Sequence, residues 1–114
     1  MKIAIIGSRG LHLTDFGKYF SLDVSEIVSG GAKGIDHDAE MYAQLHGIKT
    51  TIFLPDYEKY GKAAPIVRNK RIVDYADEVL AFWDGESKGT LSVIRYCEKQ
   101  GKKITVIHKE KCND

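Results

Sequence analysis

Hydrophobic positions along the chain fall into two alternating patterns. In the first, short runs are nearly continuous in apolar and β-branched residues, as expected for strands buried on both faces of a parallel sheet. A Gly or Pro precedes or follows each run and would end it. The expected strands are Lys2–Ile6, Glu26–Ser29, Lys49–Leu54, Glu78–Phe82 and Lys103–His108. This pattern predicts a mainly parallel sheet of about five strands.

The second pattern is amphipathic and predicts helices between the strands. Lys33–His46 repeats apolar residues on one helical face and ends at Gly47. Pro65 favours the first turn of a second helix, and Thr90–Gln100 predicts a third that ends at Gly101. Because strands and helices alternate, we expect an α/β fold: a Rossmann-like three-layer sandwich with strand order 3-2-1-4-5.

Two connecting segments are less regular. Leu11–Phe20 is expected to be a short helix or a loop with one turn, and Pro55–Ala64 is expected to be the loosest part of the chain. In the second helix, the helical period places Ile66, Asn69 and Val73 on the inward face.

Length, composition and charge are those of one ordinary domain. The chain has 114 residues, of which 43% are hydrophobic, and no linker or repeat divides it, so residues 1–114 are expected to form a single domain. Its net charge of +1 provides no global field that would attract nucleic acid or a membrane. The first apolar stretch is too short for a signal peptide or a membrane span, so we expect a cytoplasmic protein. Cys97 and Cys112 lack zinc-site spacing and are expected to be reduced thiols.

Three glycine-bearing turns each follow an expected strand and precede a helical segment. They read Gly7-Ser8-Arg9-Gly10, Ser29-Gly30-Gly31-Ala32-Lys33-Gly34 and Asp84-Gly85-Glu86-Ser87-Lys88-Gly89-Thr90. In strand order 3-2-1-4-5 the three preceding strands are neighbours, so the turns would face one crevice at the carboxyl ends of the strands. Glycine lets the backbone turn sharply and approach a ligand, and the first N–H groups of a helix lack internal partners. The turns therefore predict an anion site suited to phosphate.

The second turn is the strongest candidate for phosphate. Ser29 can donate a hydroxyl, and Lys33 adds a positive charge beside Gly30 and Gly31. Asp36, in the first turn of the next helix, could accept hydrogen bonds from ribose hydroxyls, although the helix dipole also favours a carboxylate there without any function. The turns match neither a Walker A loop nor a dinucleotide-binding fingerprint.

Further candidates lie beside the turns. Arg68 could clamp a phosphate, and an inward Asn69 could either reach a ligand or cap backbone at the sheet edge. Trp83 directly precedes the third turn and could stack on a base, whereas packing is the simpler interpretation of Tyr57 and Tyr60. The histidines show no metal spacing, so we assign no metal ligand, cofactor or catalytic residue. The predicted ligand-binding residues are Gly7, Ser8, Arg9, Ser29, Gly30, Gly31, Lys33, Gly34, Asp36, Arg68, Asn69, Trp83, Asp84, Gly85, Ser87, Gly89 and Thr90.

These motifs resemble the SLOG superfamily, and within it the small YspA/YpsA-related domains. The resemblance covers nearly the whole chain and implies a Rossmann-like fold with a pocket for nucleotides or nucleotide-derived signals. The segments that carry it are Ile6-Gly7-Ser8-Arg9, Val28-Ser29-Gly30-Gly31-Ala32-Lys33-Gly34-Ile35-Asp36, Pro55-Asp56, Tyr60-Gly61-Lys62-Ala63-Ala64, Arg68-Asn69 and Ala81-Phe82-Trp83-Asp84-Gly85-Glu86-Ser87-Lys88-Gly89-Thr90.

Related families imply two other functions. The Lonely Guy phosphoribohydrolases are similar at the second turn and carry a P-G-G-x-G-T-x-x-E motif at the third, where the glutamate position is Val93 here. An isopropyl group cannot replace a catalytic carboxylate, although Asp36, Asp84 or Glu86 could take its place. The DNA-processing protein A is similar at the glycine turns and binds single-stranded DNA. That function needs a basic track, for which this chain offers Lys59, Lys62, Arg68, Lys70 and Arg71.

The sequence therefore leads to one main hypothesis and two alternatives. The main hypothesis is binding, for sensing or sequestration, of a nucleotide or nucleotide-derived small molecule. The alternatives are an N-glycosidase acting on a nucleoside 5′-monophosphate and a single-stranded DNA-binding protein. The near-neutral charge favours a pocket for a single ligand, so we expect neither a nucleic-acid nor a membrane partner. A homodimer is left open because relatives commonly form one.

Overall fold

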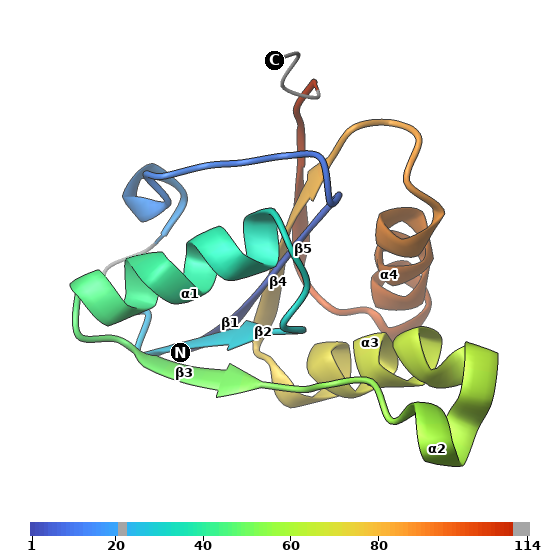
Figure 1. Cartoon of the computed structure of the whole chain (residues 1–114). Coiled ribbons are helices and arrows are strands. Elements are labelled where there is room, and N and C mark those ends of the chain that lie inside the picture. Colours follow the sequence, from blue (N-terminus) through green and yellow to red (C-terminus); the bar gives the residue numbers. More distant parts are fainter. Residues whose placement is uncertain (21–22, 111–114) are drawn as a thin grey trace.

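The computed structural model describes residues 1–20 and 23–110 and shows an α/β fold built on a five-stranded sheet (Figure 1). The strand order is β3-β2-β1-β4-β5, and every neighbouring pair is parallel. This confirms the predicted fold class and strand order. The strands are β1 (Lys2–Gly7), β2 (Glu26–Ser29), β3 (Lys49–Ile52), β4 (Glu78–Trp83) and β5 (Ile104–His108).

The helices occupy the predicted places between the strands. Each principal helix follows a glycine-bearing turn or, for α3, begins next to Pro65. The helical elements are η1 (Gly17–Tyr19), α1 (Ile35–Leu45), α2 (Tyr57–Tyr60), η2 (Gly61–Ala63), α3 (Ala64–Tyr75) and α4 (Lys88–Gln100). Leu11–Phe20 contains the single short turn η1, as one of the two expectations allowed.

Pro55–Ala64 is more ordered than its composition suggests, because short helices form there. The Asp56 side chain accepts a hydrogen bond from the Lys59 N–H at 3.1 Å and so caps α2 at its N-terminus. The next helical turn, η2, leads directly into α3. This stretch therefore connects β3 to α3 through two consecutive helical turns.

The sheet has a hydrophobic core on each face, because successive strand residues point to opposite sides. In β1, Ile3 and Ile5 pack with Ile35 of α1 and with Phe16. The residue between them, Ala4, faces the opposite cluster, which includes buried residues of α3 and α4. Figure 1 shows the resulting three layers, with α1 on one side of the sheet and α3 and α4 on the other.

One orientation predicted for α3 is wrong. Ile66 was expected to face inward, but its side chain is 49% exposed. The face of α3 that packs inward carries Ala64, Ile72 and Val73, and Ile66 does not lie on it. The predicted burial of Val73 is confirmed, whereas Asn69 is half-buried.

The cysteine and membrane expectations meet the structure only in part. Cys97 is buried on the face of α4 that packs into the core, and this burial raises the pKa of its thiol to about 11. Cys112 lies outside the described residues. No helix within residues 1–20 and 23–110 is long and apolar enough to cross a bilayer.

Candidate functional site

A cleft of about 490 Å³ opens at the carboxyl ends of β1 and β4. These strands are neighbours in space although β2 and β3 lie between them in sequence, so the strand order reverses at this point. The loops that follow β1 and β4 therefore lead to opposite faces of the sheet, which opens a crevice between them. The walls of the cleft come from the first and third turns, from the start of α1 and from the start of α3.

Many of the predicted ligand-binding residues line this cleft. From the first and third turns it includes Gly7, Ser8, Arg9, Asp84, Ser87, Gly89 and Thr90, and from α1 and α3 it includes Asp36, Arg68 and Asn69. Sequence reasoning did not include five further lining residues. They are Ile6, Gly10, Ala32, Pro65 and Glu86. Gly10, Ala32 and Glu86 belong to turns already identified, whereas Ile6 and Pro65 carry no side-chain chemistry that a sequence pattern could reveal.

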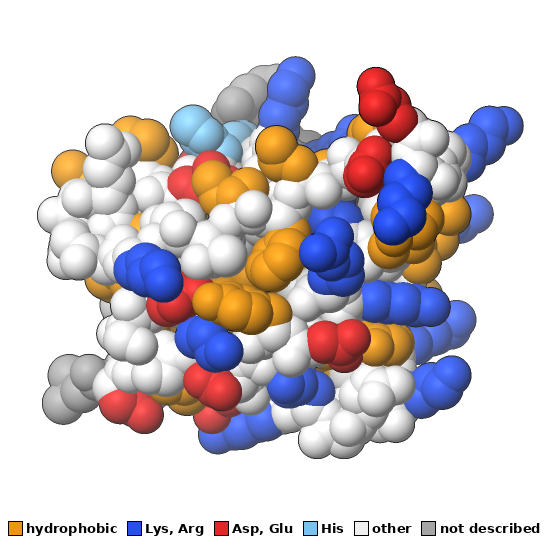
Figure 2. All heavy atoms as spheres, turned by 90° about the horizontal axis from the view of Figure 1, so that it is seen from below, with side chains coloured by type: hydrophobic (Ala, Val, Ile, Leu, Met, Phe, Trp, Pro, Cys, Tyr) orange, Lys and Arg blue, Asp and Glu red, His pale blue; other side chains and the backbone are white. Residues whose placement is uncertain are grey.

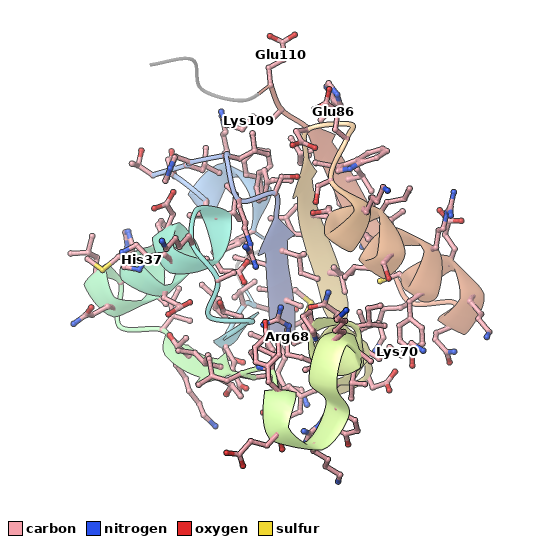
Figure 3. All side chains as sticks on the ribbon, turned by 45° about the vertical axis from the view of Figure 1, so that its right-hand side comes forward. His37, Arg68, Lys70, Glu86, Lys109 and Glu110 are labelled. Atoms are coloured by element: carbon pink, nitrogen blue, oxygen red, sulfur yellow. The ribbon has the colours of Figure 1, made fainter. Side chains whose placement is uncertain are left out.

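The remaining predicted residues lie outside the cleft. Ser29 and Gly30 are buried at the end of β2. Trp83 ends β4 and Gly85 belongs to the third turn, and neither lines the cleft. A second hollow, of about 390 Å³, contains Gly31, Lys33 and Gly34 together with Ala32, His12 and His37. Figure 3 shows His37 well apart from Arg68. The predicted phosphate turn is thus divided between the protein interior and a separate hollow.

Two N–H groups of the second turn, those of Gly31 and Ala32, are bound by the protein's own side chains. The Ser29 hydroxyl oxygen accepts a hydrogen bond from the Gly31 N–H at 3.2 Å, and the hydroxyl donates to Glu40 Oε2 at 2.8 Å. Asp36 Oδ2 accepts from the Ala32 N–H at 3.2 Å. These contacts close the part of the turn that the sequence favoured for phosphate.

Ser8 connects the first turn to the third. It is 2% exposed, and its hydroxyl oxygen accepts from the Asp84 N–H at 3.3 Å. Its hydroxyl also lies 3.5 Å from the Thr90 hydroxyl. The two walls of the cleft are therefore held together by direct hydrogen bonds.

The third turn is organised by its own polar side chains. Asp84 Oδ1 accepts hydrogen bonds from the N–H groups of Glu86 and Ser87, each at 2.8 Å. Ser87 then caps α4, since its hydroxyl accepts from the Thr90 N–H at 3.4 Å. The Trp83 indole N–H donates to the Ser87 carbonyl at 3.1 Å, so it supports this turn.

Some main-chain donors at the cleft remain available. The N–H groups of Arg9, Gly10 and Gly89 have no acceptor within the part of the chain that the structure describes. Gly89 lies in the first turn of α4, where the helix dipole is positive. An anion at the cleft would therefore meet unpaired donors from two separate turns.

Asp36 of α1 and Arg68 of α3 line one side of the cleft, the deep end. Asp36 is 6% exposed, and this burial raises the pKa of its carboxyl group from 3.8 to about 6. The Ala32 N–H and the Arg68 charge oppose the shift in pKa, and the nearby Glu40 carboxylate adds to it.

The guanidinium of Arg68 is held in place by acceptors of the protein. Its Nη1 donates to the Gly30 carbonyl at 2.5 Å and its Nε to Asn69 Oδ1 at 2.7 Å. Burial lowers its pKa, the charge of Arg9 lowers it further, and the Asp36 carboxylate raises it. Figure 3 shows Arg68 near the centre of the molecule, whereas Lys70 of the same helix lies toward the outside.

Two glycines here are required by packing within the protein. A Cβ atom on Gly7 would lie 2.4 Å from atoms of the Ile35 side chain. A Cβ on Gly30 would lie 2.9 Å from Arg68 Nη1 and 3.0 Å from Asp36 Oδ2. From the sequence we expected the backbone at these glycines to approach a ligand, whereas the groups that approach them in the structure belong to the protein.

The basic side chains proposed for a nucleic-acid track lie mostly outside the cleft. Seen from below, Lys and Arg side chains gather on the side of α2, α3 and α4 (Figure 2). Several of them contact aromatic rings: Lys70 Nζ lies 5.7 Å from the centre of the Tyr96 ring, and the Arg71 guanidinium lies 5.7 Å from that of Phe53. Among the five candidates for the track, Arg68 is the one that lines the cleft.

Within residues 1–20 and 23–110, no group of three or more His, Cys, Asp or Glu side chains could hold a metal ion.

Comparison with known proteins identifies no relative of this chain. No protein-family model matches the chain. No curated protein and no solved structure shows a significant match to it.

Proposed function

We propose that the cleft between the first and third turns binds a nucleotide or nucleotide-derived small molecule by its phosphate. The observation that carries this proposal is the meeting of unpaired N–H groups from Arg9, Gly10 and Gly89 at one cleft. In a ligand-free protein such donors bind water, and a phosphate oxygen can replace that water with a charge-assisted hydrogen bond.

Charge and hydroxyl groups at the same end of the cleft also favour a phosphate. Arg9 lines the cleft and is exposed, so its guanidinium is free to pair with two phosphate oxygens. The Thr90 hydroxyl lies beside the N-terminus of α4. We therefore propose that the phosphate binds at the first and third turns, rather than at the second turn that the sequence favoured.

The deeper part of the cleft suits the sugar. Asp36 can accept hydrogen bonds from ribose hydroxyls, and Asn69 lines the same cleft. Ile6 and Pro65 supply apolar surface for a base. The resemblance to the SLOG superfamily supports this proposal, because its segments at the first turn, at Arg68-Asn69 and at the third turn contribute to the cleft.

The test is isothermal titration calorimetry with AMP, GMP, CMP, UMP, ADP-ribose and cyclic nucleotides. We expect at least one of them to bind, and we expect Arg9→Ala to weaken that binding about tenfold or more, since it removes a charge-assisted contact. Arg95→Ala, at an exposed position of α4, removes the same charge outside the cleft and is the matched control. Absence of heat with every compound, in protein that circular dichroism shows to be folded, would contradict the proposal.

A second candidate function is N-glycosidase activity, and the observation that favours it is the buried Asp36 carboxyl in the cleft. A pKa raised to about 6 is suited to a group that exchanges a proton near neutral pH. Against this candidate, Val93 is 1% exposed and packs in the core, so the glutamate position of the Lonely Guy motif faces away from the cleft. Release of free base from AMP, lost in Asp36→Asn while binding persists, would support catalysis.

A further inference from the structure

The deep end of the cleft carries an excess of negative charge. Asp36 lines it and is 6% exposed, with Oδ2 anchored by the Ala32 N–H at 3.2 Å. Glu40, one helical turn further along α1, lies close enough to raise the pKa of Asp36. Asp36 interacts with the Glu40 carboxylate and with the Arg68 guanidinium, and these three groups together carry a net negative charge when both carboxylates are ionised.

Arg68 offers little additional attraction for an anion. Two of its N–H groups already donate, one to the Gly30 carbonyl and one to Asn69 Oδ1. Moving the guanidinium toward a ligand would break both bonds and would leave the Asp36 carboxylate without its neighbouring cation. The guanidinium therefore stays in its position and partly neutralises the negative charge of Asp36.

The two ends of the cleft thus differ in the chemistry that they accept. The outer end presents unpaired N–H groups and the Arg9 side chain. The deep end presents a carboxylate fixed by the backbone, which accepts hydrogen bonds and repels negative charge.

We propose that Asp36 determines ligand specificity, so that the cleft accepts nucleotides with a free ribose 2′,3′-diol and rejects those with a second phosphate on the ribose. This inference rests on the proposed function and specifies the class of ligand for the same cleft. A diol donates two hydrogen bonds to a carboxylate, whereas a ribose phosphate would bring a second anion against Asp36 and Glu40 in a poorly solvated place.

The experiment compares ligand pairs by calorimetry at about pH 8, where the Asp36 carboxyl is ionised. The probes are AMP, adenosine 2′,5′-bisphosphate and adenosine 3′,5′-bisphosphate, with the three guanosine compounds as a second series. For the wild type we expect both bisphosphates to bind about tenfold or more weakly than the monophosphate. In Asp36→Asn, which keeps an acceptor for the Ala32 N–H, we expect the difference to fall below about threefold.

Glu98→Gln is the matched control, because it changes the net charge equally at an exposed position near the C-terminal end of α4. We expect it to discriminate as the wild type does. A further arm uses only the wild-type protein: 2′,3′-dideoxy-AMP, which lacks both donors, should bind about tenfold or more weakly than AMP. If Asp36→Asn does not fold, this comparison of AMP with 2′,3′-dideoxy-AMP tests the inference without any variant.

The possible outcomes separate this inference from the proposed function. If a monophosphate binds and its bisphosphates bind equally well, or if removing the diol changes nothing, the specificity inference is overturned and the proposed function stands. Equal discrimination in Asp36→Asn and the wild type also overturns it. If no monophosphate binds to folded protein, the proposed function fails and the specificity inference fails with it.

Discussion

At the scale of single residues, Asp36 shows how one side chain can shape both the stability of the fold and the chemistry of the cleft. Its carboxylate accepts the Ala32 N–H in the turn before α1 and so helps to close that turn. Burial nevertheless opposes its charge, which is why its pKa is raised from 3.8 to about 6. From the sequence, the simplest reason for a carboxylate at this position was stabilisation of its charge by the helix dipole. That stabilisation does not outweigh the cost of burying the charge.

We predict that Asp36→Asn stabilises the protein at neutral and alkaline pH. A carboxyl whose folded-state pKa is raised contributes stability below the unfolded value of 3.8, and this contribution is lost as the pH rises through about 6. The variant should exceed the wild type by about 2–3 kcal/mol in free energy of unfolding at about pH 8, and the difference should vanish below about pH 4. Urea unfolding across this pH range measures it. A difference that did not change with pH would assign the effect to packing.

A second residue-scale prediction concerns the close approach at Gly7. In Gly7→Ala the new methyl group would meet Ile35 at 2.4 Å in the core, so we expect a loss of about 1–3 kcal/mol in stability. Gly89→Ala is the contrasting variant, because a Cβ there meets nothing within 4 Å and the residue is helical. It should be neutral or stabilising by about 0.5 kcal/mol. Urea unfolding of both variants tests the comparison, and equal effects would contradict it.

At the scale of elements, the third turn links fold and site because it both ends β4 and starts α4. Asp84 accepts two main-chain hydrogen bonds within the turn, and Ser87 caps the helix that follows. The first turn depends on it, since Ser8 accepts the Asp84 N–H. The free donors at the cleft therefore have fixed positions before any ligand arrives, which reduces the entropy lost on binding.

We predict that Asp84→Ala destabilises this turn and weakens ligand binding together. Loss of two main-chain hydrogen bonds should lower the free energy of unfolding by about 1–3 kcal/mol. Asp84→Asn retains an oxygen acceptor and should keep most of the stability, because Asn also forms this type of turn. Thermal unfolding and calorimetry with the nucleotide bound most tightly by the wild type provide the two readouts. Equal losses in the Ala and Asn variants would show that the charge, rather than the hydrogen bonds, is required.

At the scale of the whole molecule, the distribution of charge matters more than its total. The net charge is +1, yet Lys and Arg side chains gather on the side of α2, α3 and α4. Part of this basic surface is engaged with Tyr96 and Phe53. The cleft itself combines Arg9 and Arg68 with Asp36, Asp84 and Glu86, so it does not form a continuous positive track.

This arrangement predicts a weak salt dependence. Between about 50 and 200 mM salt, the dissociation constant of a bound mononucleotide should rise by less than about tenfold, as expected for one or two charge contacts. Single-stranded oligonucleotides should show no tight binding by fluorescence anisotropy under the same conditions. A steep salt response, with loss of oligonucleotide binding in a variant carrying Arg68→Glu and Arg71→Glu, would instead favour the single-stranded DNA hypothesis.

Local patterns in the sequence were sufficient to predict the architecture of the fold. Alternating apolar runs and amphipathic segments predicted the parallel sheet and the three principal helices. A strand that is buried on both faces is apolar along its whole length, whereas a helix that is buried on one face repeats its apolar residues with the helical period. They also located the turns at the carboxyl ends of the strands. Ile66 shows where the method fails, since helical period alone does not determine which side of α3 meets the sheet.

Only the tertiary structure decided which main-chain donors of the glycine turns are already paired and which of them line the cleft. The sequence by itself determined that three glycine turns follow neighbouring parallel strands, but it favoured the second turn for phosphate. In the folded chain Ser29 and Asp36 accept hydrogen bonds from the N–H groups of Gly31 and Ala32, whereas donors at Arg9, Gly10 and Gly89 remain open within the described residues. A hydrogen bond depends on distance and direction between groups that only folding brings together, so no sequence pattern reports which donors are already paired.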